Sequence, residues 1–242
     1  MTKPEQTACP VERMVVFMLT AHDLSFLKEH MPCIGHIGPA DLRAVTEAGS
    51  VSECAAGEML LSKGKECNGV VLAVRGQLRA YFESEDGKEI TLYRLLPGDI
   101  CILSASCVLK NITFEVTLEA EKPSAVCIIP AALWARLVER YGEVRTFSME
   151  LVNERFSEVM WVMEQMVSKN MGERVAAFLL EQSVLENTQS LTLTHEAIAK
   201  NLGTAREVVS RILKYLQGDG LLRVSRGRIT LTDVKRLRQM SR

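Results

Sequence analysis

The sequence has no apolar run long enough to cross a membrane. Residues 14–21, MVVFMLTA, form an uninterrupted stretch with little polarity, but a spanning helix needs about 20 such residues. Glu5 and Glu12 precede this stretch, where a secretory signal peptide would carry basic residues. The sequence therefore predicts a cytoplasmic protein that has no membrane partner.

Cysteine motifs are also lacking, although the chain contains seven cysteines. The number is odd and no two of them form a Cys-x-x-Cys pair, which argues against a disulfide framework and against a structural zinc site. We expect no metal site and a reducing environment in which most of these thiols are small buried side chains. The seven are Cys9, Cys33, Cys54, Cys67, Cys101, Cys107 and Cys127.

Net charge is nearly absent, −1 at pH 7, but the charge is unevenly distributed. Residues 191–242 contain eleven Lys or Arg and four Asp or Glu, so this end carries +7 and the preceding 190 residues carry −8. A basic end on an acidic body predicts that one domain binds a nucleic acid duplex. With 242 residues, 47% of them hydrophobic, the chain is long enough for two domains.

Residues 193–220 have the pattern of two short helices joined by a tight turn. Thr194 is a predicted N-cap of the first helix, Gly203 interrupts the apolar spacing, and Thr204 is a predicted N-cap of the second. This arrangement is typical of a helix-turn-helix, although a generic pair of helices would show similar spacing. The apolar positions are Ala197, Ile198 and Leu202 in the first helix and Val208, Val209, Ile212, Leu213 and Leu216 in the second.

The exposed positions of the second predicted helix favour DNA binding over the generic alternative. Arg206 and Arg211 are donor forks that suit guanine or phosphate, Glu207 can accept from cytosine, and Ser210 can do either. Two short alternating segments then flank a predicted turn at Arg226-Gly227, which completes a winged helix-turn-helix.

This segment resembles the DNA-binding domain of the Crp/Fnr family of bacterial transcription regulators. The family's recognition helix carries an Arg-Glu-x-x-x-Arg pattern, matched by Arg206, Glu207 and Arg211, and Ser210 lies where some members contact a base. The resemblance implies a sequence-specific regulator that binds as a homodimer to an inverted repeat whose half-sites lie about 34 Å apart. Residues expected to contact phosphate are Thr194, Lys200, Thr204, Lys214, Arg226 and Arg228.

Glu207 has a second interpretation. Thr204-x-x-Glu207 also fits a capping box, in which the carboxylate binds the Thr204 amide and contacts no base.

A β-rich region precedes this end of the chain. Residues 59–62, 69–74, 77–83 and 89–96 are short β-prone runs separated by glycine, with a predicted hairpin turn at Asp86-Gly87. Together with a Pro-Gly-Asp turn at residues 97–99 and a predicted strand at 125–129, their order resembles the cyclic-nucleotide-binding-type β-roll of Crp/Fnr sensors. The resemblance then covers roughly residues 35–235, and the predicted fold class is α+β.

A cupin-like metalloenzyme also uses a small β-barrel and is the competing interpretation. Its chemistry needs clustered histidine and acidic ligands inside the barrel. All four histidines, His22, His30, His36 and His195, lie outside residues 50–135. We therefore expect no enzymatic activity.

Residues 131–170 show a helical pattern with a regular apolar seam. Successive seam positions lie three or four residues apart over more than two heptads, which is typical of a helix that packs against a partner helix. Packing of the same helix on its own barrel is the alternative, and both can hold. Residues 168–172 are the expected hinge, because glycine weakens a helix there. The seam consists of Met149, Val152, Phe156, Val159, Met163 and Met166.

We therefore predict four segments: an N-terminal extension at 1–34, a β-roll sensor at 35–135, a dimerisation helix and hinge at 136–170, and a winged helix-turn-helix at 171–242. RNA polymerase is a further expected contact of a regulator with this organisation.

The sequence says less about which signal the β-roll senses than about DNA binding. In family members that bind cyclic AMP, the segment after the Pro-Gly-Asp-like turn carries a Gly-Glu and an Arg-Ser pair. Residues 100–114 here contain no arginine and no acidic residue, and Lys110 is their sole cation, which argues against a cyclic nucleotide. Cys9 and Cys33 are too few and too widely spaced for the family's iron–sulfur cluster.

Three interpretations of the sensor stay open: a small ligand or a haem in the roll, thiol chemistry at Cys101 and Cys107, or inert buried cysteines. No cofactor is identified. The alternative function is a ligand-independent winged-helix factor whose β-roll is only a dimer scaffold. The predicted effector or redox residues are Cys101, Leu103, Ser104, Ser106, Cys107 and Lys110.

Overall fold

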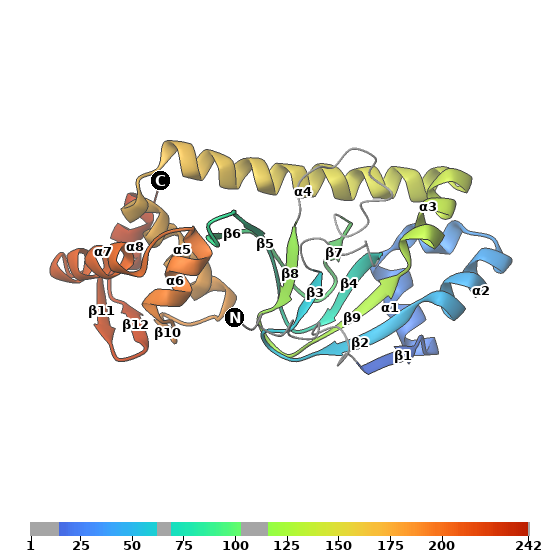
Figure 1. Cartoon of the computed structure of the whole chain (residues 1–242), viewed down its shortest axis with the longest axis horizontal. Coiled ribbons are helices and arrows are strands. Elements are labelled where there is room, and N and C mark those ends of the chain that lie inside the picture. The colour runs from blue at the N-terminus through green and yellow to red at the C-terminus, as the bar shows by residue number, and fades with distance from the viewer. Residues whose placement is uncertain (1–14, 62–68, 103–115, 242) are drawn as a thin grey trace, which may run out of the picture. The chain divides into compact units, whose positions relative to one another are not determined.

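The computed structural model describes residues 15–61, 69–102 and 116–241, and these form two compact units (Figure 1). The first unit comprises the chain up to Phe82 together with Leu92–Ser157, and the second comprises Glu83–Thr91 and Glu158–Arg242. Antiparallel sheets dominate the first and helices dominate the second, which confirms the predicted α+β class.

The elements that precede the last strand of the first unit are β1 (Val15–Met18), α1 (Ala21–His30), the 3-10 helix η2 (Pro32–His36), α2 (Pro39–Ala48), β2 (Ser50–Cys54), β3 (Met59–Leu61), β4 (Val70–Arg75), β5 (Leu78–Glu83), β6 (Glu89–Leu95), β7 (Ile100–Cys101) and β8 (Thr117–Ala120). They include four of the predicted strand segments, which correspond to β3, β4, β5 and β6. The remaining predicted segment corresponds to β9 (Ser124–Ile129).

Helices then alternate with short strands to the end of the described chain. These elements are α3 (Ala131–Arg140), α4 (Gly142–Ser168), α5 (Met171–Leu185), β10 (Ser190–Leu191), α6 (His195–Leu202), α7 (Arg206–Gly218), β11 (Leu222–Ser225), β12 (Arg228–Leu231) and α8 (Val234–Met240).

Two sheets of the first unit face each other across one apolar core. The five-stranded sheet has the order β1-β2-β9-β4-β7 and the four-stranded sheet the order β3-β8-β5-β6 (Figure 1). Val71 and Ala73 of the first sheet share this core with Leu78 and Leu118 of the second. The arrangement is the rolled β structure that the sequence predicts.

The other face of the five-stranded sheet is covered by helices. Val70 and Leu72, which alternate with Val71 and Ala73 along β4, pack in a second core with residues of α1, η2, α2 and α3. Successive side chains of a strand point to opposite faces, so the first four residues of β4 are all apolar because both of its faces are buried there, and the strand ends at the exposed Arg75.

A buried carboxylate ties α2 to the end of α3. Tyr141 donates its hydroxyl to Asp41 Oδ2 at 2.8 Å and accepts the Gly38 amide at 2.9 Å. Arg140 Nη1 lies 3.0 Å from the same Asp41 oxygen, and Arg136 Nη2 lies 3.6 Å from the other. Asp41 therefore has charged and neutral partners although its side chain is only 8% exposed.

Helix α4 continues the chain after a break at Tyr141, so the predicted helical region 131–170 is two helices. Helix α4 ends at Ser168, the first residue of the predicted hinge at 168–172. Asn170 then caps α5 by accepting the Glu173 amide while the Glu173 carboxylate accepts the Asn170 amide. This reciprocal cap, rather than glycine alone, separates the two helices.

The second unit has its own apolar core. Val175 and Leu179 of α5, Ile198 of α6, Leu213 of α7 and Leu237 of α8 are all fully or almost fully buried in it. A three-stranded sheet of order β10-β12-β11 completes the unit and forms the predicted wing. Within the described ranges, every helix is too short or too polar to cross a membrane.

We predict that Asp41→Ala lowers the free energy of unfolding by about 1–3 kcal/mol, because Tyr141 and two arginines lose their acceptor. Urea denaturation measures the change. Glu47→Ala removes the same charge from an exposed position of α2 and should change stability by less than about 0.5 kcal/mol. Equal losses in the two variants would contradict the assigned role of Asp41.

Candidate nucleic-acid interface

The first helix of the pair, α6, begins and ends as its sequence predicts. Thr194 accepts the Ala197 amide at 3.0 Å through its hydroxyl, which confirms it as the N-cap. Gly203 ends the helix in the left-handed conformation, with φ 65°, and donates its amide to Ala199. A residue with a side chain is strained at this φ, so glycine suits the turn.

The predicted cap of α7 is wrong. Its N-cap is Ala205, and no side chain bonds the first turn. The Thr204 amide instead donates to Ala199 at 3.0 Å, which keeps Thr204 in the turn that closes α6. Because the helix starts one residue later than predicted, Glu207 does not occupy the third position and the capping-box interpretation fails.

Arg211 and Lys214 lie on the face of α7 opposite its buried residues, and Arg206 is exposed at the start of the helix. Val209, Leu213 and Leu216 are at most 1% exposed, as expected for core positions. Arg206 is the first residue of the helix, and Glu207 follows it as an exposed residue on the same face as Arg211. Of the side chains predicted to contact DNA from this helix, all but Ser210 are exposed: Arg206, Glu207, Arg211 and Lys214.

Ser210 differs from its neighbours because it is half-buried and hydrogen-bonded. His195 Nδ1 and Ser210 Oγ are 2.8 Å apart, and this bond links the first turn of α6 to the middle of α7. The sequence analysis did not predict a role for His195, because the spacing of residues within one helix gives no information about a contact with another helix. His195 fixes the position of a predicted base-contacting hydroxyl.

The remaining predicted phosphate contacts occupy two places. Arg226 and Arg228 are exposed at the turn between β11 and β12, the tip of the wing. Lys200 projects from α6, and its Nζ lies 3.2 Å from Glu89 Oε1. Lys200 is therefore an exposed cation, with 44% of its side chain accessible, that also belongs to an ion pair.

Three described residues lie together around Cys101, the predicted effector residue that the structure describes. Cys101 is 1% exposed and its Sγ lies 3.6 Å from the Tyr93 hydroxyl. The Arg155 guanidinium lies 5.0 Å from the centre of the Tyr93 ring, a cation–π contact made from α4. Tyr93 and Arg155 were not predicted. The other predicted effector residues, Leu103, Ser104, Ser106, Cys107 and Lys110, lie outside the described residues.

Burial controls the chemistry of the described thiols. It raises the pKa of Cys33 and Cys127 to about 12 and that of Cys54 to about 11, against an ordinary value of 9.0. Nearby carboxylates, Glu58 and Glu53, raise the Cys54 value further. At neutral pH these thiols are almost entirely protonated, so they are poor nucleophiles. In the part of the chain that the structure describes, His, Cys, Asp and Glu form no group of three suited to a metal ion.

Comparison with known proteins identifies the same two modules. Residues 173–240 match the family model described as a Crp-like helix-turn-helix domain, and residues 51–141 match that of a cyclic nucleotide-binding domain. A solved transcriptional regulator of the Crp/Fnr family from Eubacterium rectale is 41% identical, with a TM-score of 0.85, over 88% of this chain and 99% of that one.

Two further similarities are more distant. The anaerobic regulatory protein of Pasteurella multocida is 28% identical over 76% of this chain and 69% of its own length. FixK2 of Bradyrhizobium japonicum is 21% identical, with a TM-score of 0.62, over 80% of this chain and 98% of its own, and shares the fold.

We predict that Ser210→Ala lowers the free energy of unfolding by about 0.5–1.5 kcal/mol through loss of the bond to His195, while base preference stays the same. Thermal unfolding and binding to a panel of duplexes measure the two effects. Altered base preference with unchanged stability would show that Ser210 reads a base instead.

We also predict that iodoacetamide at pH 8 leaves Cys33, Cys54 and Cys127 unmodified in the native protein, because their raised pKa values suppress the thiolate. Mass mapping after a short pulse, with urea-unfolded protein as control, measures the labelling. Native labelling should rise only as the pH approaches 11. Rapid labelling of any of the three at pH 8 would contradict the assigned burial.

Proposed function

This chain belongs to the Crp/Fnr family of transcription regulators, and we propose that it binds an inverted-repeat operator as a homodimer whose affinity is set by a signal sensed in the β-roll. The observation that carries the proposal is that α7 has a buried apolar face, an opposite exposed face with Glu207 and Arg211, and an exposed Arg206 at its N-terminal end. That face has the donors and acceptors that base edges in the major groove require.

Specificity is assigned to the first two turns of α7. Loss of the capping box leaves the Glu207 carboxylate available to accept from cytosine, and the two arginines suit guanine. Lys214, Thr194, Thr204 and the wing cations contact phosphates, which position the protein without reading sequence.

The homodimer is supported by the exposed apolar seam of α4. Met149, Phe156, Met163 and Met166 are 52%, 63%, 54% and 42% exposed, and Val152 and Val159 between them are half-buried. Such a regular stripe of large apolar side chains is costly to leave in water and suits a twin helix. The same helix buries Val144 and Leu151 in the core of the first unit, so it serves both roles that its sequence suggests.

The sensor is assigned to the roll, residues 35–135, followed by the dimerisation helix and hinge at 136–170 and the DNA-binding domain at 171–242. Tyr93 and Cys101 face the core shared by the two sheets, and Arg155 of α4 stacks on Tyr93. A ligand or a redox change at this point can alter the packing of the dimerisation helix directly. The signal then acts as a population shift between arrangements of the dimer.

We predict that Arg211→Ala costs about 1–3 kcal/mol of binding to the preferred duplex and relaxes the choice at one base pair. Competition between duplexes substituted at each position, followed by fluorescence anisotropy, measures both effects. Arg43→Ala, an exposed arginine on α2, is the matched control and should leave the preference unchanged. Equal loss on preferred and random duplexes would contradict base reading by Arg211.

We predict that Phe156→Glu converts the dimer to monomers, because the substitution places two like charges in the apolar seam. Sedimentation velocity measures the change in mass. Ser157→Glu adds the same charge at an exposed neighbouring position of α4 outside the seam and should remain dimeric. A Phe156→Glu protein that sediments like the wild type would assign the dimer contact elsewhere.

A further inference from the structure

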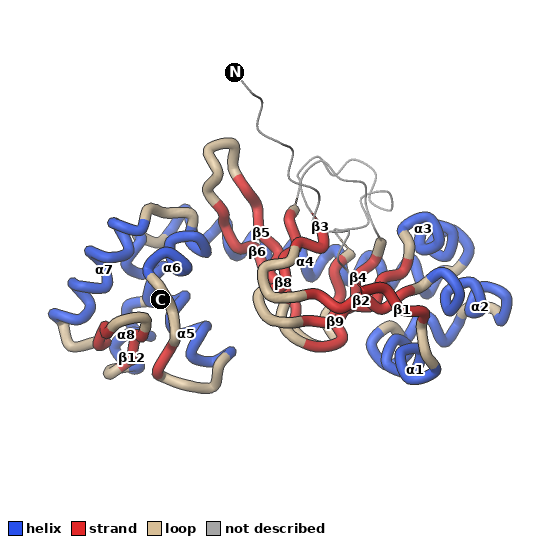
Figure 2. The backbone as a smooth tube through the Cα atoms, turned by 60° about the horizontal axis from the view of Figure 1, so that its bottom comes forward, coloured by secondary structure: helices blue, strands red, loops and turns tan. Residues whose placement is uncertain are grey.

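The tip of one hairpin of the roll belongs to the DNA-binding unit. Strands β5 and β6 are joined by a turn, drawn as a tan loop above their labels in Figure 2, and residues Glu83–Thr91 cluster with the C-terminal helices. The turn is well formed, since Ser84 binds both Asp86 and the Lys88 amide through its hydroxyl. It is a built hairpin and not a loose loop.

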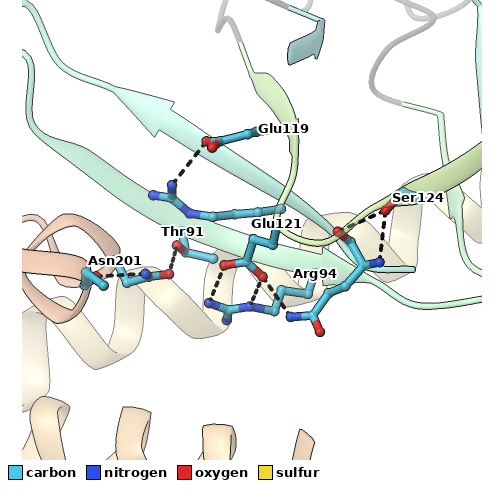
Figure 3. A network of polar contacts seen from close by, with 9 residues as sticks. Thr91, Arg94, Glu119, Glu121, Ser124 and Asn201 are labelled. Carbon is cyan, nitrogen blue, oxygen red and sulfur yellow. Dashed lines mark hydrogen bonds and ion pairs between the residues drawn. The ribbon is translucent and has the colours of Figure 1, made fainter. Parts of the chain in front are cut away.

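Three successive residues of this hairpin contact three successive residues of α6. Glu89 Oε1 lies 3.2 Å from Lys200 Nζ, and Ile90 forms an antiparallel bridge with Leu202. The Thr91 hydroxyl donates to Asn201 Oδ1 at 2.7 Å (Figure 3). The contacts combine an ion pair, a backbone pairing and a side-chain hydrogen bond, so they define one specific binding position for the hairpin on α6.

We propose that this hairpin is an intramolecular clamp that competes with DNA for Lys200, so that a docked hairpin weakens duplex binding and its release strengthens it. The clamp is residues Glu83–Thr91. The proposal rests on the proposed function of the helix-turn-helix, because it assigns a regulator to that surface.

Charge explains why docking opposes DNA binding. Lys200 is the cation of α6 predicted to contact phosphate, and Glu89 has a side chain that is only 15% exposed beside it. An ammonium paired with a carboxylate releases no counterion when a phosphate approaches, and the carboxylate itself repels the phosphate. The docked clamp therefore removes one phosphate contact and adds one repulsion.

Gly203, which follows α6, lies in close contact with the hairpin. A Cβ on Gly203 would lie 2.6 Å from Ile90 Cγ1, so the space that glycine leaves is filled by Ile90. Asn201 is engaged on both sides, since its amide nitrogen donates to Ala197 at 2.9 Å while its oxygen accepts from Thr91. These contacts give the clamp a defined position against the turn of the DNA-reading motif.

Chain continuity connects the clamp to the sensor. Its residues join β5 directly to β6, and three positions after Thr91, Arg94 is held by Glu121 through Nε at 2.8 Å and Nη2 at 3.2 Å (Figure 3). Gln77, beside the start of β5, also donates to Glu121 at 2.7 Å. Both strands are thus fastened to one carboxylate, and a signal that shifts them moves the clamp with them.

The test compares Glu89→Gln with Glu85→Gln on a random-sequence duplex of about three helical turns. Glu85 is exposed on the same hairpin and makes no ion pair among the described residues, so it controls for the change in net charge. Fluorescence anisotropy over a series of NaCl concentrations gives affinity and salt dependence. Circular dichroism and thermal unfolding confirm that each full-length variant is folded.

Glu89→Gln should bind about two- to fivefold more tightly than Glu85→Gln at low salt, with a slope of log affinity against log salt steeper by about 0.9. In a Lys200→Gln background the difference in slope should disappear and the difference in affinity should shrink, because no ammonium remains to be released and only the repulsion by Glu89 still differs. Equal affinity and slope in the original background, or weaker binding by Glu89→Gln, overturns the clamp. Failure of every variant to bind duplex overturns the proposed function as well, so the two failures are distinguishable.

Discussion

Burial of one face of α7 is the constraint on which the DNA-reading surface depends. Val209, Leu213 and Leu216 are packed in the core of the second unit with α5, α6 and α8, and this fixes the rotation of α7 about its axis. Once that rotation is fixed, Glu207, Arg211 and Lys214 must point to solvent together, while Arg206 is exposed because it is the first residue of the helix. On the proposed function, the core therefore sets specificity indirectly, because it decides which side chains of the helix are exposed.

The same reasoning connects the two proposals about regulation. A free energy difference of a few kcal/mol separates the conformations of most regulated proteins, and a signal acts only through contacts that differ between them. The clamp offers such contacts: one ion pair, one hydrogen bond and one backbone bridge. Interactions of this number and type are strong enough to bias a domain and weak enough for a ligand to reverse.

The sequence predicts the fold well where local pattern decides it. Strands β3 to β6 lie within a residue or two of their predicted bounds because glycines punctuate them, and the Asp86-Gly87 turn lies where its residues place it. Strands β1, β2, β7, β8 and β10 were not identified. Strands β7 and β10 have two residues each, and β1 lies within an apolar stretch whose pairing with β2 depends on residues 32 to 38 positions away.

The site was predicted less completely, for a physical reason. Residue types at helical spacing identified the exposed arginines of α7, but the start of that helix depends on where the Thr204 amide finds its acceptor, and the prediction was one residue early. The His195–Ser210 bond, the Arg155–Tyr93 contact and the Glu89–Lys200 pair all join residues far apart in the chain. Contacts of this kind leave no periodic signal, so only the folded chain reveals them.

The measurement that tests the account most directly is selection of bound duplexes from a random library by the purified full-length protein, followed by sequencing. The account predicts enrichment of an inverted repeat whose half-site centres lie about 10 base pairs apart, one helical turn. Enrichment of a single unrepeated motif, or of no motif at all, would contradict a symmetric dimer that reads sequence through α7.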